Sequence, residues 1–198
     1  MNDLSVSITN RMSYTGRGDG GKTSVIGLNG PERVSKDDDR IQAMGDLDEL
    51  SSVLGLCRAK ARYDTSFLDD SGVGDLILSL QRDISVIQTV IAGGQTEFSL
   101  ERTRFLEGHI DSMEKNFTSV NDFVIPGGTE MSAYLDMARA ISRRAERSTI
   151  SFERKKGVIL NPSVKVYLNR LSSLLFTLAR LSAVKSGIKE EVSKRVAG

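Results

Sequence analysis

Five segments of the chain carry apolar residues at intervals of three and four, and this periodicity restricts the fold more than any other feature. The segments run from about Asp37 to Ala61, Asp75 to Ala92, Leu100 to Phe117, Thr129 to Phe152 and Asn161 to Ser186. Such spacing places the apolar side chains on one face of an α-helix. No run alternates polar and apolar residues over a length that would require a sheet. The sequence therefore predicts an all-α fold, a bundle of five helices.

The same spacing identifies the residues expected to face the core. They are Ile41, Met44, Leu47, Leu50, Val53, Leu54 and Cys57; Leu76, Leu80, Ile84, Ile87 and Ile91; Phe105, Leu106, Ile110 and Met113; and Met131, Leu135, Ala138, Ala145 and Phe152. Helix ends are marked by Gly93-Gly94, by Thr129 as an N-cap with Glu130 in the first turn, by Asn161-Pro162, and by Gly187.

The composition is that of an ordinary globular domain. The chain has 198 residues, 39% hydrophobic and 27% charged, so we expect one domain over residues 1–198, with 1–13 and 188–198 flexible. The formal net charge of +1 argues against nucleic acid or a membrane surface as partner. No apolar run is long enough to span a membrane. The single cysteine, Cys57, favours a reducing compartment and hence a cytoplasmic protein.

A glycine-rich stretch near the N-terminus matches the spacing of a phosphate-binding loop. Gly16 to Thr23 has glycine, four residues, then Gly-Lys-Thr. The standard motif joins a buried strand to a long helix, but the residues before the stretch are polar, and Gly30-Pro31 excludes a long helix after it. Glycine amides in a tight loop can still hold an anion, helped by Lys22 and Ser24. The stretch is expected to be a loop or hairpin in either case, and the alternative to an anion site is a flexible N-terminal loop.

One face of the fourth predicted helix gathers guanidinium groups. Within an arc of about 100°, beside the apolar face, lie Arg139, Arg143, Glu146 and Arg147. Like charges at this spacing oppose each other unless anions neutralise them, and arginine suits polyphosphates or carboxylates. The alternative is a solvated or interhelical salt-bridge face, for which the first helix offers Asp46, Asp48 and Glu49.

The remaining chemistry-bearing residue types indicate no further site. His109 is the only histidine, and no cysteine lies at metal-ligand spacing from it, so neither a zinc site nor a catalytic triad is predicted. Cys57 falls on the apolar face of its helix and is expected in the core.

Six motifs occur in order along most of the chain. They are Tyr14-Thr15 with Gly18-Asp19-x-Gly21-x-Thr23-Ser24, Arg33-x-x-Lys36-Asp37-Asp38-x-Arg40, Gly45-x-x-Asp48-Glu49-Leu50-Ser51, Phe123-Val124-Ile125-Pro126-Gly127-Gly128-Thr129, Ala138-Arg139-x-x-x-Arg143-Arg144-Ala145-Glu146-Arg147 and Tyr167-Leu168-Asn169-Arg170-Leu171-Ser172. Together they resemble the ATP:cob(I)alamin adenosyltransferases of the propanediol-utilisation type. The resemblance implies a ferritin-like bundle, assembled as a homotrimer with sites between subunits. It also implies transfer of the 5′-deoxyadenosyl group of ATP, with Mg²⁺, to the cobalt of cob(I)alamin, releasing inorganic triphosphate.

The resemblance also implies roles for individual residues. ATP would be held from one subunit by Thr15, Gly16, Arg17, Gly18, Asp19, Thr23, Ser24 and Lys36, and from its neighbour by Arg143, Arg144, Ala145, Glu146, Arg147 and Asn169. Of these, Arg143 and Glu146 would also be catalytic. Phe123 would lie beneath the corrin and displace the lower axial ligand, and Asp48 and Arg139 would form a salt bridge on that face.

Two positions depart from the pattern of the family. Ser173 follows Asn-Arg-Leu-Ser where aspartate is usual, and Asp39 replaces a common proline. The first change puts the rate and the strength of cobalamin binding in question. The alternatives to the enzyme are a non-catalytic ATP- and cobalamin-binding delivery protein of the same fold, and a structural bundle with an arginine-rich interaction face. The expected partners are a cobalamin reductase and an adenosylcobalamin-dependent enzyme.

Overall fold

The computed structural model describes residues 16–27, 30–63, 72–116 and 123–193, without the side chains of 26–27. Within these ranges lie five helices: α1 (Asp39–Ala61), α2 (Val73–Ile91), α3 (Glu101–Glu114), α4 (Glu130–Lys156) and α5 (Pro162–Lys185). Four short strands accompany them: β1 (Lys22–Gly27), β2 (Gly30–Ser35), β3 (Phe123–Val124) and β4 (Val192–Ser193). The predicted five-helix bundle is confirmed, and no helix in the described part of the chain is long and apolar enough to cross a membrane.

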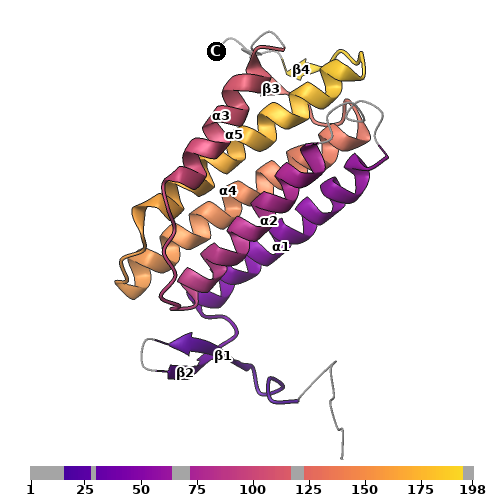
Figure 1. The fold of residues 1–198 in the computed structure, drawn as a ribbon. Coiled ribbons are helices and arrows are strands. Elements are labelled where there is room, and N and C mark those ends of the chain that lie inside the picture. Colours follow the sequence, from indigo (N-terminus) through magenta and orange to yellow (C-terminus); the bar gives the residue numbers. More distant parts are fainter. Residues whose placement is uncertain (1–15, 28–29, 64–71, 117–122, 194–198) are drawn as a thin grey trace, which may run out of the picture.

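The helices pack side by side around α4 (Figure 1). α4 contacts both α1 and α5, α2 packs against α1, and α3 packs against α5. The core between them is built from the apolar helix faces, and Cys57 lies in it fully buried. Burial raises the pKa of the Cys57 thiol to about 12, because the thiolate is poorly solvated there.

The predicted helix caps are confirmed. Thr129 caps α4: its hydroxyl accepts from the Ser132 N–H at 2.9 Å, and the Ser132 hydroxyl accepts from the Thr129 N–H at 2.8 Å. Asn161 caps α5 with its side-chain oxygen on the Ser163 N–H, and proline follows at the first helical position. These caps satisfy backbone donors at the helix starts, which is why local sequence alone located them.

The predicted core faces are buried or half-buried, with one exception. Phe105 was expected to face inward but is 48% exposed, and its ring lies edge-on to His109 with 4.6 Å between ring centroids. The reason is that α3 packs chiefly against α5, so a narrow face is covered. Leu106 and Ile110 occupy that face and are buried.

The prediction that no sheet forms is wrong for two short ribbons. β1 and β2 form an antiparallel hairpin, with Lys22 opposite Ser35, so the glycine-rich stretch leads into a hairpin, one of the two forms expected for it. Pro31 is tolerated because every strand of a two-stranded ribbon is an edge strand. β3 pairs with β4, so the chain up to Ser193 is paired with another segment where we expected a flexible end. Figure 1 shows the two ribbons at opposite ends of the bundle.

Candidate functional site

The glycine-rich loop folds into two successive reverse turns. The Asp19 N–H donates to Gly16 O at 3.3 Å, and the Gly21 N–H donates to Gly18 O at 3.2 Å. Gly16 and Gly21 have φ of +69° and +74°, a region that glycine adopts without strain. The loop leads into β1 and not into a helix, which confirms that it is no standard phosphate-loop fold. Thr15 lies outside the described residues.

The Arg33 side chain and the Lys36 backbone hold this loop against the base of the hairpin. An Arg33 Nη donates to Arg17 O at 2.7 Å, and the Lys36 N–H donates to Gly21 O at 2.8 Å. A Cβ on Gly18 would lie 3.3 Å from the Lys36 ammonium nitrogen, so the lysine packs directly over that glycine. Lys36 and Ser24 are exposed and Thr23 is half-buried. The loop and the hairpin after it therefore carry an exposed ammonium group, on Lys36, and an exposed hydroxyl, on Ser24.

The arginine stripe on α4 divides into exposed and paired members. Arg143 and Arg147 are exposed, and no carboxylate of the described residues lies within ion-pair distance of either. Glu146 is half-buried and accepts a hydrogen bond from the Asn169 amide on α5 at 3.2 Å. Two guanidinium groups on this face are thus available to an anion from outside the chain, beside a carboxylate fixed in place.

Arg144 turns to the other side of α4 and pairs with α1. Its guanidinium bonds Glu49, and its Nε lies 3.3 Å from Asp46 Oδ1. The hydrogen bond to Glu49 raises the pKa of Arg144. The expected pairing of α1 acids with an α4 arginine is therefore confirmed for Arg144. The side chain of Ala145, another residue implied by the resemblance, is fully buried in the core.

A cleft of about 360 Å³ opens between α3, α4 and α5 beside this stripe. Its lining residues are Glu114, Arg139, Arg143, Ser172, Ser173, Phe176 and Thr177. The cleft joins two arginines implicated by the motifs to Ser173, the position that departs from the family pattern. Glu114, Phe176 and Thr177 were not identified from the sequence; only the helical register of α3 and α5 would have suggested them.

The expected salt bridge between Asp48 and Arg139 is not present within one chain. Arg139 is half-buried and donates from Nε to Asp136 Oδ1 at 3.1 Å. Asp48 is exposed on α1, and among the described residues no cation lies within ion-pair distance of it. Both side chains remain accessible from the surface.

The implied site residues lie far apart in a single chain. The hairpin precedes the N-terminus of α1, whose cap residue Asp38 pairs with the C-terminal end of α4, with 2.7 Å between Asp38 Oδ2 and Lys156 Nζ. Arg143 lies 13 residues earlier on α4, about 20 Å along the axis at 1.5 Å per residue. Phe123 is 70% exposed and belongs to β3, at the opposite end of the bundle from the hairpin (Figure 1). One chain therefore does not bring the loop, the arginines and Phe123 together.

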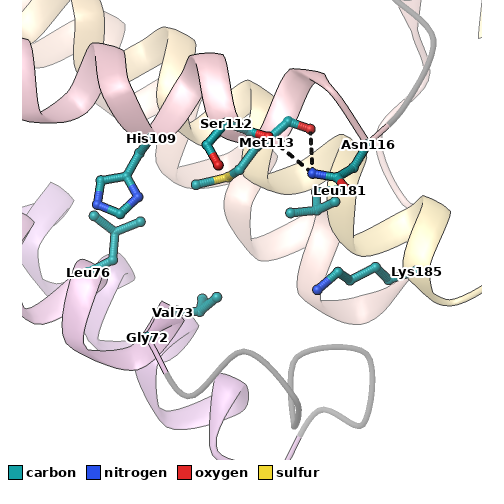
Figure 2. Close-up of a pocket in the computed structure, with 9 residues that line it drawn as sticks. All are labelled: Gly72, Val73, Leu76, His109, Ser112, Met113, Asn116, Leu181 and Lys185. Carbon is teal, nitrogen blue, oxygen red and sulfur yellow. Dashed lines mark hydrogen bonds between the residues drawn. The ribbon is translucent and has the colours of Figure 1, made fainter.

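A further pocket of about 300 Å³ lies between the start of α2, α3 and the end of α5. Figure 2 shows its lining, in which His109 and Leu76 approach from opposite walls and the Asn116 amide donates to backbone carbonyls of its own helix. None of the implied site residues lines it. Nor do the described residues contain a group of three or more His, Cys, Asp or Glu side chains suited to a metal ion.

Comparison with known proteins identifies relatives over nearly the whole chain. A family model described as cobalamin adenosyltransferase matches residues 13–182. The corrinoid adenosyltransferase of Bacillus subtilis (strain 168) is 31% identical over 188 residues, which cover 93% of each chain. That of Mycobacterium leprae (strain TN) is 34% identical over 181 residues, which cover 85% of this chain and 90% of the relative.

Solved structures agree with these relatives. A PduO-type ATP:corrinoid adenosyltransferase from Lactobacillus reuteri, a phenylalanine-to-alanine variant complexed with cobalamin and ATP, superposes with a TM-score of 0.82 at 25% identity, covering 92% of this chain and 99% of the other. An arginine-to-lysine variant of an adenosyltransferase from the same organism, complexed with ATP, gives a TM-score of 0.80 at 28% identity, covering 91% and 99%.

Proposed function

The chain belongs to the cobalamin adenosyltransferase family, and we propose that it carries out the reaction at a site shared between two copies of the chain. The protein is a transferase that moves the 5′-deoxyadenosyl group of ATP to the cobalt of cob(I)alamin and releases inorganic triphosphate. The observation that carries the shared site is the separation of the hairpin loop, the α4 arginines and Phe123 along one bundle. A second chain brings a loop and an arginine face together.

The nucleotide is bound from two sides in this arrangement. One chain contributes its glycine-rich loop with Lys36, and the neighbour contributes the arginine face of α4, where Arg143 and Arg147 lack carboxylates of their own in the described part of the chain. The interface joins different surfaces of the two chains, so it repeats around a ring until the ring closes. We propose a homotrimer for this ring, as the family resemblance implies.

The chemical step asks little of the protein beyond positioning and charge. Cob(I)alamin is itself the nucleophile that attacks C5′ of the ribose, so no protein nucleophile is required. Negative charge grows on the departing triphosphate, and Lys36 and Arg143 stabilise it. The Glu146 carboxylate and the Asn169 amide oxygen are ligands of the kind that suit a Mg²⁺ ion bound to the nucleotide phosphates.

Cobalamin is bound with the help of Phe123, at the end of the bundle opposite to the hairpin of the same chain. The exposed ring of Phe123 lies beneath the corrin and displaces the lower axial ligand, which destabilises Co(II) relative to Co(I) and makes the reduction accessible. Asp48 and Arg139, which are unpaired with each other in one chain, form their salt bridge across the interface. We place the reaction in the cytoplasm, with a separate reductase as source of Co(I) and an adenosylcobalamin-dependent enzyme as recipient.

An anaerobic assay tests the reaction directly. Purified protein, chemically reduced cob(I)alamin and MgATP are mixed while the visible spectrum and the released triphosphate are followed. We expect adenosylcobalamin and triphosphate in equal amounts. ATP binding without conversion would favour the delivery protein, and Ser173→Asp would then test whether the missing carboxylate is the cause.

Subunit complementation tests the shared site. Lys36→Ala and Arg143→Ala chains are each expected to be inactive alone. In mixed oligomers, a site that takes its loop from the Arg143→Ala chain and its arginine from the Lys36→Ala chain is intact, so about a quarter of the sites recover. No recovery in oligomers proven to be mixed would contradict the shared site, because a site within one chain always retains one lesion.

A further inference from the structure

A cluster of four charged side chains lies where α4 and α5 meet the C-terminal segment. Arg180 is 1% exposed; its Nε lies 2.7 Å from Glu190 Oε2, and its Nη2 bonds Asp136. Asp136 also accepts the hydrogen bond from Arg139. Two cations and two carboxylates are thus balanced in a place from which water is largely excluded. Because unpaired buried charges are costly, each member holds the others in position.

Glu190 belongs to the segment that carries β4, which pairs with Phe123. Phe123 lies opposite Ser193 in the ladder, and the Ile125 N–H donates to Glu191 O at 2.8 Å. A ladder this short is not stable by itself. Its position therefore depends on what fixes the C-terminal segment to the bundle, and the side chain of that segment with a buried partner is Glu190.

Glu190 also packs directly on the turn that joins β3 to α4. A Cβ on Gly128 would lie 3.2 Å from Glu190 Cγ, a contact tighter than side chains normally make. The preceding Gly127 has a φ of +120°, which only glycine adopts without strain. The segment around Phe123 is thus held by Glu190 from one side and by the backbone ladder from the other.

We propose that Glu190 is a positioning residue for Phe123: anchored by Arg180, it fixes the C-terminal segment and thereby the place of the Phe123 ring. The inference rests on the proposed function, in which that ring displaces the lower ligand of cobalamin. The same cluster reaches the cleft, because Arg139 lines it and the Arg180 guanidinium lies over the ring of Phe176, another lining residue, at 4.8 Å. The charged cluster around Arg180 therefore supports both the segment that carries Phe123 and the cleft.

Two substitutions at Glu190 separate its size from its charge. Burial raises the pKa of the Glu190 carboxyl, and the nearby Arg180 opposes this only in part. The ionised form is thus poorly solvated, and glutamine can replace it as an acceptor for Arg180 at similar volume. Alanine removes the acceptor and the contact with Gly128. We expect Glu190→Gln to preserve the position of Phe123 and Glu190→Ala to lose it.

Electron paramagnetic resonance of cob(II)alamin bound with MgATP measures the effect. The nitrogen of the lower ligand splits the cobalt lines, so the fraction without this splitting reports ligand displacement. We expect Glu190→Ala to reduce that fraction, and turnover with it, by about tenfold to a hundredfold, as small misplacements of a positioning group do. The ATP dissociation constant should stay within about twofold, since neither Glu190 nor Arg180 is among the residues assigned to the nucleotide. Glu191→Ala, an exposed neighbour of the same type, is the matched control.

Ser193→Pro disturbs the ladder while leaving the Arg180 cluster intact, so it decides the matter if Glu190→Ala does not fold. The same loss of displacement in this variant, with glutamine at 190 tolerated, supports the proposal. Wild-type displacement in Glu190→Ala, or in Ser193→Pro, overturns it, as does an equal loss of ATP affinity. Absence of displacement in the wild-type protein overturns the cobalamin part of the proposed function as well, so the two failures are distinguishable.

Discussion

Two arginines, Arg180 on α5 and Arg143 on α4, show how the same side chain serves opposite purposes. Arg180 is buried, and both of its carboxylate partners belong to the same chain. Arg143 is exposed, and no carboxylate in the described part of the chain pairs with it. The first has its anions at hand and stabilises one conformation, while the second is left to an anion that arrives from outside. A structural arginine therefore differs from a ligand-binding one in the source of its counter-ion, which is the same chain in the first case and the ligand in the second.

Removal of the buried arginine has the largest expected effect. Arg180→Ala leaves the carboxylate of Glu190 without a cation and that of Asp136 with Arg139 alone, so we expect a loss of about 3–5 kcal/mol in the free energy of unfolding. Urea denaturation followed by circular dichroism measures it. Arg147→Ala, an exposed arginine on α4, should change stability by less than about 0.5 kcal/mol. Similar losses of stability in the two variants would contradict the distinction between a buried, paired arginine and an exposed one.

The exposed arginine should behave in the reverse way. Arg143→Ala removes a donor to the departing triphosphate, so kcat/KM should fall by about a hundredfold or more. Stability should be unchanged or slightly higher, because one like charge on the α4 stripe is gone. Steady-state adenosylation and urea denaturation give the two numbers. Arg154→Ala, also exposed on α4, is the matched control and should retain activity.

Asp48→Asn asks whether an exposed charge finds its partner only in the assembly. The cobalamin side should lose about tenfold or more in apparent affinity, since Arg139 then lacks its partner across the interface. ATP affinity should change little. Titrations with each ligand separate the effects, and Asp111→Asn, exposed on α3, controls for net charge. Equal losses of both affinities would argue against a role specific to the corrin face.

The smallest effect is expected where the N-cap of α1 pairs with the end of α4. The hydrogen bond from Lys156 lowers the pKa of Asp38 below its ordinary value of 3.8. The pair therefore adds stability above that ordinary value and loses it as the pH falls through the lowered pKa. Asp38→Asn keeps the helix cap but not the charge, so Tm at pH 7 should fall by no more than about 2 °C. Once the pH lies below the lowered pKa of Asp38, the variant and the wild-type protein should converge; a constant difference at every pH would mean that packing, not charge, is involved.

Helices and caps were predictable because their signals are local. Thr129 and Asn161 satisfy neighbouring backbone amides, and the periodic apolar faces need no knowledge of the partner helix. The two-stranded ribbons were not predictable, because a strand of two residues such as β3 has no sequence pattern of its own and forms only by pairing with β4. Phe105 was misplaced because periodicity gives the direction of an apolar face but not the width that a neighbour covers.

The candidate site was proposed from the sequence as a set of residues, and the sequence did not indicate how those residues lie in one chain. Motif order identified Lys36, Arg143 and Phe123, but spacing in sequence does not reveal that they lie at different levels of the bundle. The cluster around Arg180 was missed for another reason. Asp136 and Glu190 are ordinary acidic residues in sequence, and only the contact between α4, α5 and the C-terminal segment makes them a buried set.

The buried thiol of Cys57 allows the rate at which the bundle opens to be measured by chemical labelling. A thiol reagent reacts only with a thiolate that it can reach. In the folded protein the Cys57 side chain is fully buried and its pKa is raised to about 12, so the thiol is neither accessible nor ionised. Labelling at neutral pH therefore counts openings of the bundle, one modification per chain, in native buffer. Arg180→Ala should increase the labelling rate of Cys57, and Arg143→Ala should leave that rate unchanged.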